Sequence, residues 1–233
     1  MIVCPVCKHS NDEFAIKCVS CGSFIQDRVP NLDFFAIIWL IIESPAQAFK
    51  KIIIAEHKNF VLFLGLFLGI GSSFALMWVK KSGNSFDNLF PLLLYGIFIG
   101  IVISIPMFYM LAGTFHLFAK LLRGKAAFKD TYGIVGWSLV PVMLSVVFIL
   151  PLELSTLGLF LFTTNPSAYE VKPVVTIVLL GFDGLLLLWS VMLAAYGISM
   201  AHRFRFATSL ILTLSVIGAV STVSFLIYSS FNI

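Results

Sequence analysis

Long apolar runs separated by short polar turns dominate the chain. Five of these runs carry at most one charged side chain each, and they cover residues 60–79, 89–119, 132–152, 174–201 and 207–231. A helix needs about 20 consecutive apolar residues to cross the hydrocarbon core of a bilayer. The pattern therefore predicts an all-α membrane protein built on a bundle of five transmembrane helices.

A shorter apolar run, FFAIIWLII at residues 34–42, precedes the first of these spans. A helix of this length reaches about 14 Å, half of the hydrocarbon core, so we expect it to lie in the interface or to insert partway. The sequence Ser44-Pro45-Ala46-Gln47 predicts the start of a new helix, with Ser at the N-cap, Pro at N1 and Gln at N3. Residues 34–58 are thus expected to form interfacial helices that lead into the bundle.

The helix that starts at Ser44 has two different sides. Phe49, Ile52 and Ile53 lie on one side, while the cations Lys50, Lys51 and Lys58 are available to meet anionic headgroups. This pattern is typical of an in-plane amphipathic helix. The alternative is an ordinary helix whose apolar side packs on the N-terminal module.

Two CxxC pairs near the N-terminus contain all the cysteines of the chain: Cys4, Cys7, Cys18 and Cys21. Two thiolates in one tight turn can share a face of a tetrahedral Zn²⁺, and a second turn supplies the other face. We therefore predict a structural zinc site in a ribbon over residues 1–25. Two disulfides or an incidental cluster are the alternatives. His9 is a further candidate ligand, but four sulfurs already close the site.

A ribbon of this size cannot build a hydrophobic core, so the metal would supply most of its folding free energy. No open coordination position is implied, which favours a structural rather than a catalytic ion. Residues 26–33 are mostly polar and contain Pro30, and we interpret them as a linker.

The composition agrees with a membrane protein. The chain is 60% hydrophobic and 11% charged, whereas a soluble domain has about 25% charged residues. No GxSxG, HExxH or P-loop motif stands in a suitable context, so we do not expect an enzyme. A basic tract interleaved with aromatic residues is also absent, so we expect no nucleic-acid partner.

A compact basic turn separates the second and third runs. Within residues 116–141, four cations stand against the single acid Asp130: Lys120, Arg123, Lys125 and Lys129. Cations beside a span resist translocation. A cytoplasmic N-terminus, with the C-terminus on the opposite side of the cell membrane, leaves only three cations outside: Lys80, Lys81 and Lys172. The cytoplasm is reducing, which agrees with zinc rather than disulfides.

Asp183 is the one acid well inside an expected span. A carboxylate within the membrane costs at least a few kcal/mol, which makes it a candidate intramembrane polar site. The alternative is an interfacial or packing role. We expect no second buried acid, no histidine pair and no basic partner within the spans. Residues 153–173 are expected to form a connector, and His116 is expected to lie at the interface.

The chain resembles the Yip1-domain family of multi-pass membrane proteins over about residues 34–230. Three stretches carry the resemblance: SPAQAFKKI, HLFAKLLRGKAAFKDTYGIVGWSLVP and WSVMLAAYGISMAHRF. The resemblance implies a domain of five spans, here residues 59–231, with a cytoplasmic N-terminus. Eukaryotic members bind prenylated Rab-type GTPases and act in vesicle trafficking and membrane shaping. The zinc ribbon departs from them and looks prokaryotic, so the Rab activity is not carried over to this chain.

These observations predict a non-enzymatic membrane scaffold or adaptor. In this reading, Zn²⁺ holds the ribbon, and the ribbon, Lys50, Lys51 and the cations of the basic turn meet membrane lipids or a cytoplasmic protein partner. Glycines four residues apart in the first two spans permit close helix contacts, including a homo-oligomer. The rival hypothesis is a small transporter or lipid-translocating protein that uses Asp183. A third hypothesis is regulation by zinc or redox state.

Overall fold

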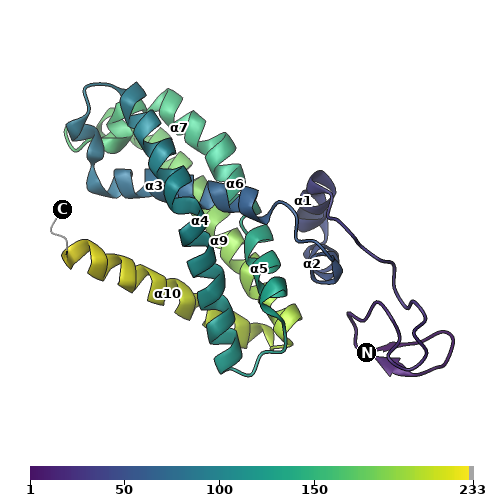
Figure 1. Cartoon of the computed structure of the whole chain (residues 1–233). Helices are drawn as coiled ribbons and strands as arrows, with labels where there is room; N and C mark the ends of the chain where they lie inside the picture. Colours follow the sequence, from purple (N-terminus) through teal and green to yellow (C-terminus); the bar gives the residue numbers. More distant parts are fainter. Residues whose placement is uncertain (231–233) are drawn as a thin grey trace.

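A computed structural model describes the backbone of residues 1–230 and the side chains of residues 1–222. Figure 1 shows a bundle of long helices, with the N-terminal strands and loops beside one end of it. Two clusters of buried side chains stabilise the bundle. One cluster includes Phe49, Ile134 and Trp137 near the N-terminal module, and the other includes Phe74 and Phe162 toward the opposite end.

The N-terminal module contains the two strands found within the described residues. Strands β1 (Ile2–Val3) and β2 (Ser10–Asn11) pair antiparallel, with Ile2 opposite Asn11 and Val3 opposite Ser10. An isolated antiparallel bridge between Lys17 and Phe24 closes a second loop in the same way. Each of the two loops carries one CxxC pair, so the module consists of two similar turns that face each other.

Four helical segments of the described chain are long and apolar enough to cross a membrane. They are α3 (Val61–Lys80), α4 (Leu89–Leu121), the segment Phe128–Thr156 and α9 (Pro173–His202). Each contains most of one apolar run in the sequence. The prediction of a helical bundle is therefore confirmed, with four helical segments long and apolar enough to be membrane spans at the predicted places.

The fifth expected span coincides with α10 (Phe206–Ser230), which packs against α4 and α9. Its part with described side chains, Phe206–Thr222, is apolar but shorter than a span requires. The fifth crossing therefore stays a prediction. Phe231, the last residue expected in that span, lies outside the described residues.

The third span consists of short helical pieces rather than one regular helix. The pieces are α5 (Phe128–Trp137), α6 (Val140–Leu144), a π-helical turn (Ser145–Ile149) and α7 (Leu150–Thr156). Pro141 and Pro151 stand at the starts of α6 and α7, where the missing N–H of proline disturbs a helix least. Glu153 belongs to α7, so its assignment to a connector is wrong.

Short helical turns join the spans at the end of the bundle opposite the module. They are η1 (Ser82–Ser85), η3 (Gly158–Phe162) and α8 (Ala168–Val171). The Asn84 side chain holds two of these connectors together, because it donates to Thr164 Oγ1 at 2.9 Å and accepts from the Thr164 amide at 3.1 Å.

Helices α1 (Phe34–Glu43) and α2 (Pro45–Ile54) lie between the module and the spans. The Asp33 carboxylate caps α1 by accepting the amide of Ala36 at 2.8 Å. Pro45 occupies the first turn of α2, as the sequence predicts, although the Ser44 side chain makes no capping hydrogen bond. The helix ends at Ile54.

The apolar side of α2 is covered by protein. Its buried residues Ala48, Phe49 and Ile52 belong to a helix that packs against α5 and α9. The contact with α9 is close, because a Cβ added to Gly197 would lie 2.8 Å from the Phe49 ring. The expectation of an in-plane amphipathic helix is therefore not confirmed.

Candidate functional site

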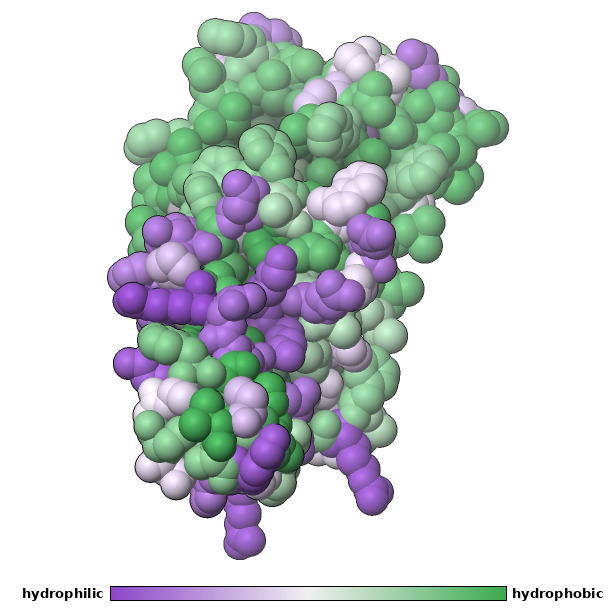
Figure 2. All heavy atoms as spheres, turned by 90° about the vertical axis from the view of Figure 1, so that its right-hand side faces the viewer, coloured by the Kyte–Doolittle hydropathy of each residue, from purple (hydrophilic) through white to green (hydrophobic). Residues whose placement is uncertain are grey.

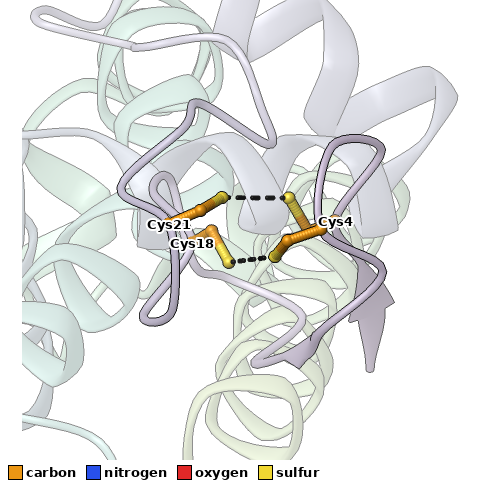
Figure 3. A group of neighbouring side chains, drawn as sticks. Cys4, Cys18 and Cys21 are labelled. Atoms are coloured by element: carbon orange, nitrogen blue, oxygen red, sulfur yellow. Dashed lines mark hydrogen bonds between the residues drawn. The ribbon is translucent and has the colours of Figure 1, made fainter.

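The four cysteines meet between the two loops of the N-terminal module. Their sulfur atoms all lie within 4.8 Å of one another. Figure 3 shows the Cys4 side chain directed toward Cys21, from the facing loop, with a Cys4–Cys21 Sγ–Sγ distance of 3.7 Å. The Sγ atoms of Cys7 and Cys18 lie 3.5 Å apart. Tetrahedral Zn–S bonds of about 2.3 Å place sulfurs about 3.8 Å apart, so this group could hold a metal ion.

The backbone shapes each CxxC pair in the same way. The Lys8 amide donates to the Cys4 carbonyl at 3.0 Å, and the Gly22 amide donates to the Cys18 carbonyl at 2.9 Å. The residue that follows each pair has a left-handed backbone conformation, with φ of 60° at Lys8 and 73° at Gly22. Glycine adopts this conformation without a Cβ penalty, whereas lysine does so less readily. The repeated turn directs both thiols of each pair toward the facing loop.

Hydrogen bonds within these turns favour the thiolate form of two cysteines. The Cys7 amide, together with the Ser23 hydroxyl, lowers the pKa of the Cys4 thiol to about 6, and the Cys21 amide lowers the pKa of the Cys18 thiol. For Cys7 the His9 amide acts in the same direction, but burial and the neighbouring thiols outweigh it and raise the pKa to about 11. Thiolates rather than thiols bind metals. All four cysteines are free, so the disulfide alternative does not apply to this structure.

Asn11 joins the two cysteine loops and was not identified from the sequence. It is 4% exposed. Its Nδ2 donates to the His9 carbonyl at 2.8 Å, and its Oδ1 accepts the Val19 amide at 3.0 Å. His9 therefore contributes its backbone here, while its ring lies outside the cysteine group. The sequence gives little indication of this role, because nothing in the pattern distinguishes Asn11 from the other polar residues between the two CxxC pairs.

Two ion pairs fasten the module and linker to the bundle. Arg203 donates to the Asp12 carboxylate of the module. It stands at the end of α9 and has a left-handed backbone conformation, with φ of 60°. In the linker, Arg28 binds both carboxylate oxygens of Glu56, at 2.5 and 2.9 Å. The Arg28 guanidinium lowers the pKa of Glu56. The module thus contacts the end of the bundle directly, in addition to its covalent link.

The predicted basic residues lie at this same end of the bundle. The four cations of the turn after α4 are all exposed: Lys120, Arg123, Lys125 and Lys129. Lys125 and Arg203 line a cavity of about 480 Å³, together with Asp12 and other residues of the module and bundle. Lys51 is exposed and Lys50 half-buried on α2. Figure 2 shows the molecule from the side that carries the N-terminal module. Hydrophilic side chains gather on the lower half of this view, below a largely hydrophobic upper half.

Lys58 is a buried cation between α2 and α3. Its side chain is 3% exposed and pairs with Asp130 at 3.2 Å. The ammonium also donates to the carbonyls of Ile52 and Ile53 at 2.5 and 2.8 Å, which satisfies the last turn of α2. Burial lowers the pKa of Lys58, and Asp130 opposes that shift. This lysine therefore joins α2 to α5 within the protein, and the expectation that it meets anionic headgroups is wrong.

Two histidines share one hydroxyl group near the basic turn. His116 Nδ1 lies 3.0 Å, and His202 Nε2 lies 2.9 Å, from Thr131 Oγ1. The hydroxyl hydrogen can serve only one ring, so the other ring must donate its own N–H. The expectation that the spans hold no histidine pair is wrong, because His116 of α4 and His202 of α9 meet at the hydroxyl of Thr131 in α5.

Asp183 also has partners that the sequence did not reveal. Ser145 Oγ, in the π-helical turn, donates to Asp183 Oδ1 at 2.6 Å. Glu153, which is 3% exposed, lines the same cavity of about 290 Å³. The expectation of no second buried acid is therefore wrong. Glu153 was missed because a glutamate after a long apolar run looks like the end of a span.

Comparison with known proteins identifies the helical part of the chain. The Yip1 domain family matches residues 39–228, which include α2, the four long apolar helical segments and the basic turn. No curated protein and no solved structure matches the chain. The family match confirms the resemblance and agrees with the four long apolar helices. The chain is therefore a multi-pass membrane protein that belongs to the Yip1 domain family.

Proposed function

We propose that the protein is a non-enzymatic membrane scaffold or adaptor. In this proposal, zinc holds the cysteine module, and the module forms a cytoplasmic platform together with the cations of the basic turn. The contact between Asp12 and Arg203 carries the proposal, because it fixes the module beside that turn. A module fixed in this way presents one surface with the bundle, whereas a freely tethered module would not.

The charge of the platform indicates what it binds. Its four exposed cations are Lys120, Arg123, Lys125 and Lys129. Each cation near an anionic membrane contributes about 1 kcal/mol to binding, and the attraction fades within a Debye length of about 8–10 Å. An anionic membrane surface or an acidic face of a cytoplasmic protein therefore fits the platform. Membership of the Yip1 domain family supports a role in membrane organisation or trafficking.

The platform is tested by vesicle capture. The full-length, zinc-loaded protein is reconstituted in phosphatidylcholine vesicles. Protease treatment of a separate aliquot measures the fraction of modules that face outward. These vesicles are then mixed with labelled vesicles that contain phosphatidylglycerol. Replacement of Lys120, Arg123, Lys125 and Lys129 by Gln is expected to weaken capture at least tenfold, as about 4 kcal/mol of attraction is removed at most.

The control variant replaces Lys80, Lys81 and Lys172 by Gln, because these cations lie at the opposite end of the bundle. It should capture anionic vesicles as the wild-type protein does, and both proteins should lose capture at high salt. Proteins that co-purify with the wild type are compared in parallel. If the platform variant retains both vesicle capture and its co-purifying proteins, the scaffold proposal is wrong.

A further inference from the structure

A second cavity lies at the end of the bundle opposite the cysteine module. It encloses about 290 Å³ between α3, the third span and α9. Its lining contains two carboxyl groups, Glu153 and Asp183, and no cation among the described residues. The platform proposed above uses neither of these acids.

Glu153 makes this cavity more than a gap between helices. Its side chain is 3% exposed, and its Oε1 atom has no hydrogen-bond partner among the described side chains and backbone. A buried polar atom without a partner is unfavourable unless a ligand or water supplies the missing hydrogen bond. The oxygen therefore needs a hydrogen-bond donor within the cavity.

The remaining groups hold the two acids in place. Ser145 donates to Asp183 Oδ1 at 2.6 Å, which fixes the aspartate side chain beside Glu153. Ser145 begins a π-helical turn, and such turns are frequent at functional sites because they change the direction of a side chain. The site is thus built by two spans rather than by one acidic cluster in a loop.

The apolar walls restrict the kind of donor. The aromatic rings of Phe74, Trp78 and Phe162 line the cavity, and Leu187, which is 59% exposed, also lines it. Ca²⁺ takes six to eight oxygen ligands, and Mg²⁺ keeps several bound waters, whereas most of this lining is apolar. An organic ammonium group suits it better, because it donates to carboxylates and interacts favourably with aromatic faces.

We propose that this cavity binds the ammonium group of a lipophilic amine. Glu153 and Asp183 accept its hydrogen bonds, the rings of Phe74 and Phe162 lie beside it, and the apolar tail leaves past Leu187 toward the lipid. The Trp78 ring also borders the cavity, and the Lys81 ammonium lies 5.2 Å from the centre of this ring. Glu153 lies three residues before the end of its span at Thr156, so the cavity is close to headgroup level. The amine comes either from an aminolipid headgroup or from a free amphiphilic amine.

Thermal unfolding of the full-length protein in phosphatidylglycerol nanodiscs tests the proposal, since that lipid carries no ammonium group. Dodecylammonium should raise the unfolding midpoint saturably, because a ligand that binds only the folded state stabilises it. Dodecanol, which lacks the charge, should not do so. Glu153→Gln and Asp183→Asn should each weaken the apparent affinity at least tenfold.

Glu170→Gln is the matched control, because Glu170 is an exposed acid of α8 at the same end of the bundle. It should keep the wild-type response to dodecylammonium. Equal responses of the wild type and the Glu153→Gln variant, or an equal response to dodecanol, would overturn the proposal.

A measurement on the unmodified chain keeps the test valid if a variant fails to fold. A hydrophobic carbodiimide should label Glu153, and dodecylammonium should protect it from labelling; labelling without protection contradicts the proposal. Phosphatidylethanolamine in the nanodiscs then distinguishes the two sources. If phosphatidylethanolamine competes with dodecylammonium, the natural ligand is an aminolipid headgroup. If it does not compete, the ligand is a free amine. Both results support an ammonium site.

Discussion

Gly69 of α3 and Gly100 of α4 bring the backbones of these two spans into contact. A Cβ on Gly69 would overlap the carbonyl oxygen of Gly100, and a Cβ on Gly100 would lie 2.5 Å from Ile70 Cα. Helices in lipid associate through such close packing, because lipid tails are as apolar as the side chains. The glycine spacings noted in the sequence are thus used within one chain at these positions.

Substitution of Gly100 by Leu should therefore destabilise the helix pair. We expect a loss of at least about 1–3 kcal/mol, because the added side chain has no space between the two backbones. Unfolding in detergent micelles with increasing denaturant measures the change. Gly113→Leu is the control in the same helix, since nothing lies within 4 Å of a Cβ at that position. Similar losses in both variants would show that the close contact is not responsible.

The cysteine module should contain one zinc ion per chain. Elemental analysis of the purified protein measures this content directly, and Cys18→Ser should abolish it, whereas Ser20→Ala in the same turn should not. Removal of zinc by a chelator should increase amide hydrogen exchange throughout the module, because the metal supplies most of its folding free energy. Purified protein without bound metal, yet with a well-protected module, would contradict the prediction.

The response of this zinc to mild oxidant separates a structural role from redox regulation. We expect the ion to stay bound, since all four ligands come from two closed turns with internal hydrogen bonds. Release of zinc together with disulfide formation, at oxidant levels that leave the helices intact, would instead favour a redox sensor.

Lys58 should make stability depend on alkaline pH. Burial lowers its pKa below the usual 10.5, so the unfolded chain binds this proton more tightly than the folded chain. The free energy of unfolding should therefore rise as the pH increases toward 10.5 and fall as the pH drops through the lowered pKa. Lys58→Met should remove this dependence, whereas Lys51→Met, at an exposed position of α2, should retain it.

Asp130→Asn tests the same ion pair from the other side. It leaves the buried ammonium without its carboxylate partner, and we expect a loss of about 1–3 kcal/mol near neutral pH. The loss should disappear in the Lys58→Met background, because no buried charge then remains. An undiminished loss in that background would show that Asp130 acts through other contacts.

Thr131→Val should weaken the contact between α4, α5 and α9. The substitution keeps the shape of the side chain but removes the hydroxyl that lies within hydrogen-bond distance of both His116 and His202. A loss of about 1–3 kcal/mol is expected, because the buried ring nitrogen of His202 and the half-buried one of His116 both lose their partner. Thr114→Val on the exposed side of α4 is the control, and equal thermal stability of the two variants would contradict this account.

Local sequence patterns predicted the parts of the fold that depend on local sequence. The length of the apolar runs predicted the four helical segments that are long and apolar enough to cross a membrane, since a crossing helix needs about 20 apolar residues. Pro45 marked the start of α2, and the spacing of Cys4, Cys7, Cys18 and Cys21 predicted that their sulfurs would meet. In all these cases the decisive contacts lie within one segment or between two adjacent turns.

The parts that were missed depend on contacts between distant segments. The hydroxyl of Thr131 meets two histidines only after three helices have packed, and Ser145 meets Asp183 only after the third span has packed against α9. The apolar side of α2 gave no indication whether Phe49 would face lipid or protein, because both surroundings are equally apolar. Periodicity alone therefore could not distinguish an interfacial helix from one covered by α5 and α9.

The left-handed backbone at Arg203 suggests a way to separate the module from the membrane domain. Glycine adopts a φ of 60° more easily than arginine, so Arg203→Gly should preserve or improve the end of α9 while it removes the ion pair with Asp12. Such a variant would keep an intact bundle, while the module would lose its ion pair with α9 and stay attached through the linker. It would reveal which properties belong to the two halves separately and which require that they be joined.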